Sequence, residues 1–198
     1  DLNTSSGQNI SGYLDVFKSV LIFSVQNKVA EDIVSNAVME IVRILLKYPR
    51  VLHELPDACI IFSDLLSVFV NAFPRFIIES TDVAKSLIEI ISIGLTIRYQ
   101  KSGRKMIQVA ECCFLSVVPF MNNNSNILEI IAPQLLYGIL MAANGNMPSN
   151  VLEEIVNSFH NIWMKTSDDI MRLVLRRIMT IKTFPSAKTK EKTKEVFV

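Results

Sequence analysis

The amino-acid sequence predicts an all-α fold, an α-solenoid of about four antiparallel helix pairs. Apolar residues recur along the chain at the i, i+3, i+4, i+7 spacing of a buried helix face. Half of the 198 residues are hydrophobic and only 20% are charged, which suits helices that are covered on two sides by their neighbours. Short polar or proline-containing turns separate the helical segments and favour antiparallel neighbours.

Proline and capping residues set the boundaries in the N-terminal half. The second helix is expected to end before Pro49, and the third to begin at Pro56 and end before Pro74, because proline disfavours helical geometry in the residue before it. Ser80 or Thr81 is expected to cap the fourth helix. The eight expected helices cover residues 11–26, 30–47, 56–73, 81–99, 103–121, 125–144, 148–165 and 167–183.

The C-terminal half shows the same kind of boundary signals. Asn124 or Ser125 is a good N-cap for the sixth helix, and Pro148 marks the start of the seventh. Ser167 is expected to cap the eighth helix. Pro133 lies inside the sixth helix, where it either kinks the helix or marks a late start.

The apolar stripe of each helix predicts which residues face the core. This assignment rests on helical periodicity alone, so it treats every apolar residue of a stripe as covered. The residues expected to face inward include Phe17, Val20, Ile33, Val38, Ile107, Phe114, Ile131, Leu135, Val156 and Trp163.

The spacing of the helices indicates the kind of repeat. Successive helix starts are separated by about 19 to 26 residues, so two helices form a unit of roughly 40 to 50 residues. That period is typical of HEAT and armadillo repeats, whereas ankyrin and tetratricopeptide units are shorter. We therefore expect HEAT-like repeats over residues 11–185, after a frayed end over residues 1–10.

The ends of the chain are interpreted as cut from a longer protein. The chain does not begin with Met, and it stops just as apolar residues appear at 196–198. Residues 186–198 are therefore expected to begin a truncated further helix or to form a disordered tail. At the other end, apolar faces that a neighbouring repeat would cover are expected near Tyr13, Phe17 and Phe23.

The sequence does not predict an enzyme. The two histidines, His53 and His160, lie in a connector and on a helix flank, where a surface or capping role is expected. Cys59, Cys112 and Cys113 lack the spacing of a metal site and are expected to be free thiols in a reducing compartment. No catalytic group, cofactor or metal site is therefore predicted.

Charge and hydropathy narrow the class of partner. The formal net charge of +1 argues against direct binding of nucleic acid, which needs a basic face. The longest uncharged run, 130–152, is interrupted by polar residues and prolines, and only about 14 of its residues are continuously apolar. A membrane span needs roughly 20, so no membrane insertion is expected. A protein is the class of partner that remains.

The second helix of each pair is predicted to bind that partner, because in a HEAT stack these helices line the concave side. Their polar stripes carry both signs of charge, which suits a protein better than a nucleic acid. For each single residue, a merely solvated helix face is the alternative interpretation. The candidate partner-binding residues are Arg43, Lys47, Lys85, Glu89, Arg172 and Arg176.

Three segments carry a resemblance to a known family. The first is LPDACIIFSDLLSVFVNAFPRFIIES, followed by VAKSLIEIISIGL and KMIQVAECCFLSVVPFM. The second is IAPQLLYGILMAANGNMPSNVLEEIVNSFHNIWMK, and the third is SDDIMRLVLRRIM, followed by FP and a Lys/Thr-rich stretch. In this layout, residues 56–198 resemble the C-terminal HEAT repeats of nuclear transport receptors of the importin-β superfamily, and most closely its transportin-SR and importin thirteen branch.

The resemblance implies a superhelical receptor that binds protein cargo on its concave side for Ran-dependent transport. It implies two further partners: the Ran GTPase, bound mainly through repeats outside this chain, and FG-nucleoporins, bound on the outer surface. Such a receptor would shuttle between cytoplasm and nucleus through the nuclear pore. The charged residues depart from the family, so no cargo-contacting position is transferred. The alternative is a HEAT-repeat scaffold subunit of a multiprotein complex that works without Ran.

Overall fold

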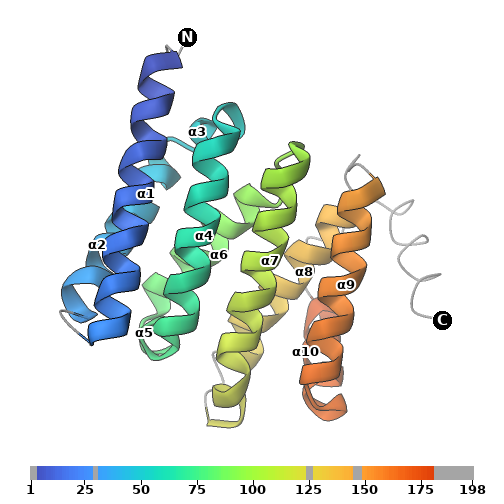
Figure 1. Cartoon of the computed structure of the whole chain (residues 1–198). Coiled ribbons are helices and arrows are strands. Elements are labelled where there is room, and N and C mark those ends of the chain that lie inside the picture. Colours follow the sequence, from blue (N-terminus) through green and yellow to red (C-terminus); the bar gives the residue numbers. More distant parts are fainter. Residues whose placement is uncertain (1–3, 29–30, 124–126, 145–148, 181–198) are drawn as a thin grey trace.

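The computed structural model of the chain describes residues 4–28, 31–123, 127–144 and 149–180 (Figure 1). Every regular element in these ranges is a helix, which confirms the all-α class. In chain order the elements are α1 (Thr4–Asn27), α2 (Glu31–Lys47), α3 (Arg50–Glu54), α4 (Pro56–Ala72), α5 (Pro74–Glu79), α6 (Thr81–Gly94), α7 (Gln100–Val117), the 3-10 helix η1 (Val118–Asn123), the π-helix η2 (Ile127–Ile131), α8 (Ala132–Asn144), α9 (Ser149–Lys165) and α10 (Asp168–Thr180).

The long helices alternate between two layers as the chain proceeds. The front layer contains α1, α4, α7 and α9, which lie side by side in that order in Figure 1. The back layer contains α2, α6, α8 and α10, where α2 contacts α6, α6 contacts α8, and α8 contacts α10. The extensive contacts therefore run mainly along each layer, from one long helix to the corresponding helix of the next pair.

The core runs through the middle of the stack, between the two layers. It is densest around α4 and α7, where Phe62, Phe69 and Phe114 are completely buried. The ring centroids of Phe69 and Phe73 are 5.7 Å apart. The ring centroids of Phe69 and Phe76 are 6.1 Å apart, in a T-shaped, edge-to-face arrangement. Burying a side chain of this size stabilises a fold by about 1.5–3 kcal/mol, so these rings supply a large part of the stability.

Proline and serine place several helix starts where the sequence analysis expected them. Pro56 occupies the first turn of α4, where its missing N–H costs nothing. The Ser80 hydroxyl accepts a hydrogen bond from the backbone N–H of Val83 at 3.4 Å and so caps α6. The Ser167 hydroxyl accepts one from Ile170 at 3.4 Å at the start of α10.

Other boundaries differ from expectation. Helix α1 begins at Thr4, well before residue 11, and the connectors after Pro49 and Pro74 are the short helices α3 and α5. Helix α6 ends at Gly94 rather than near residue 99. Gly94 packs so closely on Met106 of α7 that an added Cβ would come within 2.5 Å of the sulfur, and the chain turns directly afterwards towards α7.

Pro133 marks a late start of the sixth long helix. The π-helix η2 ends at Ile131 and α8 begins at Ala132, so that the proline occupies the first turn of α8. The predicted caps Asn124, Ser125 and Pro148, like the expected tail over 186–198, lie outside the described residues.

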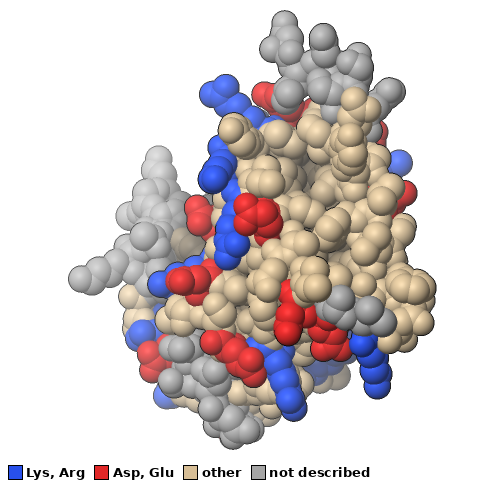
Figure 2. Space-filling model, turned by 90° about the vertical axis from the view of Figure 1, so that its left-hand side faces the viewer, with Lys and Arg blue, Asp and Glu red and all other residues tan. Residues whose placement is uncertain are grey.

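Both ends of the stack expose apolar residues that the sequence analysis placed in the core. Val20 and Ile33 are 47% and 72% exposed, and Val156 and Trp163 are 66% and 38% exposed. The core prediction was wrong for these four residues, since no further helix covers α1 and α2 or α9 and α10 in the described part of the chain. Figure 2 views the α1–α2 end and shows a broad area without charged side chains.

The expectation of uncovered apolar residues on α1 is confirmed for two of its three positions. Tyr13 is 77% exposed and Phe23 is 62% exposed, whereas Phe17 is half-buried against the core. Tyr13, Val16, Val20 and Phe23 follow a spacing of three and four residues, so they form one continuous stripe along α1.

Candidate functional site

The six predicted partner-binding residues all lie exposed on helices of the back layer. Within the described ranges, none of them forms an ion pair or hydrogen bond with a different helix, and Arg43 alone is ion-paired, to Glu40 of its own helix at 3.1 Å. They occupy α2, α6 and α10, but the intervening α8 carries no Lys, Arg, Asp or Glu, so the charges form separate groups. The residues are Arg43, Lys47, Lys85, Glu89, Arg172 and Arg176.

Polar groups of the front layer are used differently, because they join neighbouring helices. Lys105 Nζ of α7 lies 2.9 Å from a carboxylate oxygen of Asp64 on α4. On the other side of α7, the Gln108 amide donates to Glu154 of α9 at 2.9 Å, and the Asn161 amide of α9 donates to Glu111 at 3.1 Å. These front-layer side chains therefore hold neighbouring helices together.

Helix α10 presents both predicted arginines to solvent, four residues apart and hence on one face. Their neighbour Arg177 is engaged instead, since its guanidinium lies 3.8 Å from the carboxylate of Glu129 in η2. Arg172 and Arg176 consequently form a small basic group that is available to a partner.

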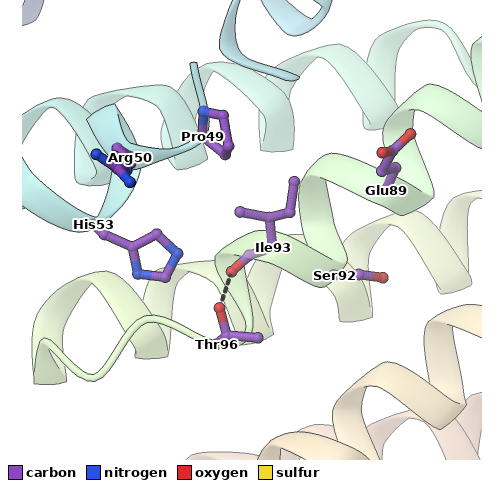
Figure 3. A pocket seen from close by; sticks show the side chains of 7 residues that line it. All are labelled: Pro49, Arg50, His53, Glu89, Ser92, Ile93 and Thr96. Carbon is purple, nitrogen blue, oxygen red and sulfur yellow. Dashed lines mark hydrogen bonds between the residues drawn. The ribbon is translucent and has the colours of Figure 1, made fainter. Parts of the chain in front are cut away.

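A pocket of about 520 Å³ opens on the back layer between α3 and α6 (Figure 3). Arg50 and His53 of α3 lie at one end of it, Glu89 lies at the other end, and Ile93 lies between them. The full lining consists of Pro49, Arg50, His53, Glu89, Ser92, Ile93 and Thr96.

Of these lining residues, the sequence analysis named only Glu89 as a candidate site residue. The sequence analysis did not predict the lining residues on α3, because it expects a connector after Pro49. The spacing of seven residues between Pro49 and Pro56 is the signal that could have indicated a separate helical turn. His53 is exposed, as expected of a surface residue, and His160 is exposed as well.

The three cysteines are free, and their burial follows the helix faces. Burial raises the pKa of the Cys113 thiol to about 12 and that of Cys59 to about 11. The half-buried Cys112 has a raised pKa for the same reason, opposed by a hydrogen bond from Asn71. Thiols with raised pKa values are poor nucleophiles, so none of the three suits catalysis.

Two further properties of the described residues bear on the kind of site. No group of three or more His, Cys, Asp or Glu side chains in the described ranges is placed to hold a metal ion. None of the helices in these ranges combines the length and hydropathy that crossing a membrane would require.

Comparisons of the chain with protein-family models, with curated proteins and with solved structures give no match. Function must therefore be argued from the sequence resemblance and from the geometry described above.

Proposed function

We propose that this chain is a segment of an α-solenoid of HEAT-like repeats that binds protein partners on its back layer. The solenoid class is supported by the order of contacts, because each helix pair packs mainly against the next pair along the chain. It is also supported by the apolar stripes at both ends, which are typical of helices that a further repeat covers.

One observation carries the partner-binding assignment: the six candidate charges on α2, α6 and α10 form no ion pair or hydrogen bond between helices within the described ranges, unlike their neighbour Arg177, which pairs with Glu129. In the front layer, contacts between neighbouring helices are formed by Lys105, Gln108 and Glu111. On the back layer, Arg172 and Arg176 make no such contact within the described ranges. Side chains that are exposed and uncommitted can pair with charges of a partner without breaking the fold.

The mixture of charge signs on these helices supports a protein as the partner. Basic groups on α2 and α10 and the acidic Glu89 on α6 would match a protein surface of alternating charge, whereas a nucleic acid would be repelled by the carboxylates. Complementary charges would mainly fix orientation and accelerate association, and the apolar surface around them would supply affinity.

Within this class we propose a nuclear transport receptor that binds protein cargo through these repeats and releases it in a Ran-dependent manner. The support is the resemblance of residues 56–198 to the C-terminal repeats of the importin-β superfamily. FG-nucleoporins and shuttling between cytoplasm and nucleus belong to the same proposal. A scaffold subunit that binds its partners on the same face without Ran is the second candidate, supported by the same geometry.

The test is a double charge reversal, Arg172→Glu with Arg176→Glu, in a protein-capture experiment from a nuclear and cytosolic extract. Exposed charges contribute little to stability, so the melting temperature should stay within about 2 °C, while captured cargo proteins should be lost through like-charge contacts. The matched control is Lys101→Glu with Lys165→Glu, which changes the net charge equally on exposed front-layer positions. Equal capture by the two double variants would contradict the assignment of the back layer.

A Ran-GTP arm separates the two candidate functions. It requires a protein that also contains the N-terminal repeats, because the resemblance places the main Ran site there. A receptor releases the captured proteins when Ran-GTP is added, and Ran-GDP serves as the control. Capture that is sensitive to the α10 reversal but indifferent to Ran-GTP would identify the scaffold.

A further inference from the structure

The pocket between α3 and α6 has opposite charges at its two ends. The Arg50 guanidinium and the His53 imidazole lie at one end, and the Glu89 carboxylate lies at the other (Figure 3). All three side chains are exposed, and none forms an ion pair within the described part of the chain. A ligand that bridges the pocket would therefore meet an anion-binding end and a cation-binding end.

The floor between these ends is apolar with hydroxyl groups beside it. Ile93 and Pro49 are both partly buried and give the centre of the pocket an apolar surface. The Thr96 hydroxyl donates to the carbonyl oxygen of Ile93 at 2.7 Å, so its oxygen can still accept a hydrogen bond. Ser92 adds a second exposed hydroxyl, and together these groups can serve the backbone of an extended peptide.

The dimensions fit a short stretch of extended chain. Glu89 and Ile93 lie one turn apart on α6, and four residues of helix advance by roughly 6 Å. Extended chain advances about 3.3 Å per residue and turns alternate side chains to the same face. Three alternate side chains of a peptide can thus lie over the anion-binding end, the apolar floor and the cation-binding end.

We infer that this pocket binds an extended segment of a protein partner in which an acidic, an apolar and a basic side chain occupy alternate positions. The acidic side chain pairs with Arg50 and His53, the apolar one covers Ile93, and the basic one pairs with Glu89. The inference rests on the proposed protein-binding function and names the class of segment that the back layer recognises. A nucleic acid or an anionic membrane fits less well, because its phosphates would meet the Glu89 carboxylate.

The test uses a fluorescein-labelled probe peptide with the central sequence Glu-Ser-Leu-Ser-Lys, blocked at both ends, and its reversed sequence. Fluorescence anisotropy measures the Kd of each peptide and of analogues with Gln in place of Glu or of Lys. Each neutral analogue should bind about twofold to fivefold more weakly, as expected for the loss of one exposed ion pair. Arg50→Gln should reduce the effect of the peptide's Glu, for which His53 remains as a partner, and Glu89→Gln should abolish the effect of its Lys.

Charge reversal gives a gain of binding that damage to the fold cannot mimic. In the Glu89→Lys variant, a probe with Glu at both charged positions should bind more tightly than the original probe. Lys165→Gln, at an exposed position at the end of α9, is the matched control and should change no Kd. Equal affinity of the wild-type chain for charged and neutral probes, or equal losses in the control variant, would overturn the inference.

The capture experiment distinguishes failure of this inference from failure of the proposed function. If capture still depends on Arg172 and Arg176 but the probes ignore Arg50 and Glu89, the pocket assignment fails and the partner-binding back layer stands. If the α10 reversal has no effect on capture either, the proposed function fails as well. Preferential binding of anionic vesicles or of single-stranded RNA over the probes would overturn the peptide assignment in favour of those ligands.

Discussion

Helix α7 in the middle of the stack and helix α1 at its end both carry an apolar face, yet the two helices bury that face to different extents. Phe114 of α7 is completely buried, because helices flank α7 on both sides within its layer. Phe23 of α1, in contrast, is 62% exposed, because in the described part of the chain α1 has a neighbour on only one side of its layer. The comparison teaches that burial in this molecule depends on the position of a helix in the stack, and much less on its apolar content.

The largest expected effect comes from one substitution made in both regions. Phe114→Ala should lower the free energy of unfolding by about 3–5 kcal/mol, because it leaves a cavity in a packed core. Phe23→Ala should change it by about 0.5 kcal/mol or less, since the ring already lies mostly in water. Urea unfolding of the two variants measures both values, and equal losses would break the distinction between middle and end.

Thiol chemistry should reveal the same distinction between covered and uncovered faces within a single helix. At pH 8, a pKa of about 12 leaves only about 10⁻⁴ of Cys113 as thiolate, while the half-buried Cys112 is more accessible. Alkylation by iodoacetamide, followed by mass spectrometry, should therefore modify Cys112 faster than Cys113. Faster modification of Cys113 would show that the core around α7 opens readily.

The raised pKa values also predict how stability depends on pH. The ordinary thiol pKa is 9.0, so below pH 9 the Cys113 thiol is neutral in both folded and unfolded chains and its contribution is fully present. As pH rises from about 9 towards 12, the unfolded chain loses this proton first, and stability falls. Urea unfolding at pH 8 and at pH 10.5 should show a smaller loss for Cys113→Ala than for the wild-type chain.

The next smaller difference in stability between the middle and the end of the stack is expected from two glycine-to-alanine substitutions. Gly94→Ala should cost about 1–3 kcal/mol, because the new methyl group overlaps the buried Met106 side chain. Gly12→Ala in α1 should instead stabilise the chain by about 0.5–1 kcal/mol, because nothing lies within 4 Å of the added Cβ and alanine favours the helix. Thermal unfolding should therefore shift in opposite directions for the two variants.

The smallest effects are expected from ion pairs. Double-mutant cycles should assign up to about 1 kcal/mol to Lys105 with Asp64, which joins α7 to α4, and about 0.3–0.5 kcal/mol to Arg43 with Glu40 within α2. Both values should fall as salt is added, because solvent reaches the half-buried Lys105–Asp64 pair and the exposed Arg43–Glu40 pair. A larger value for the α2 pair would mean that the terminal helices depend more on surface charge than the middle does.

The sequence carried enough information to predict the helices but not their neighbours. Periodicity and proline placed α4, and the serine cap placed α6, because these signals are local. The exposure of Ile33 and Val156 could not be read from periodicity, which records an apolar face without stating whether another helix covers it. The early end of α6 depends on the contact between Gly94 and Met106, which joins residues in different helices.

Like the fold, the candidate site could be predicted from the sequence only in part. Helical spacing predicted that Glu89 and Arg172 are exposed on the same layer, and the structure confirms this position, because the pairing of helices follows from their order. Arg50 and His53 were missed as site residues, since the pocket requires the short α3 to fold back beside α6. Sites formed between elements require knowledge of packing, whereas stripes along one helix do not.

Hydrogen–deuterium exchange, resolved by helix, tests the proposed repeat stack most directly. In a stack where each pair is stabilised by its neighbours, protection should be highest in α4 and α7 and should decrease towards both ends. The account predicts that amides of α1 and α2, and of α9 and α10, exchange at lower denaturant concentration than those of α4 and α7. Uniform protection of all these helices, or the highest protection at either end, would contradict it.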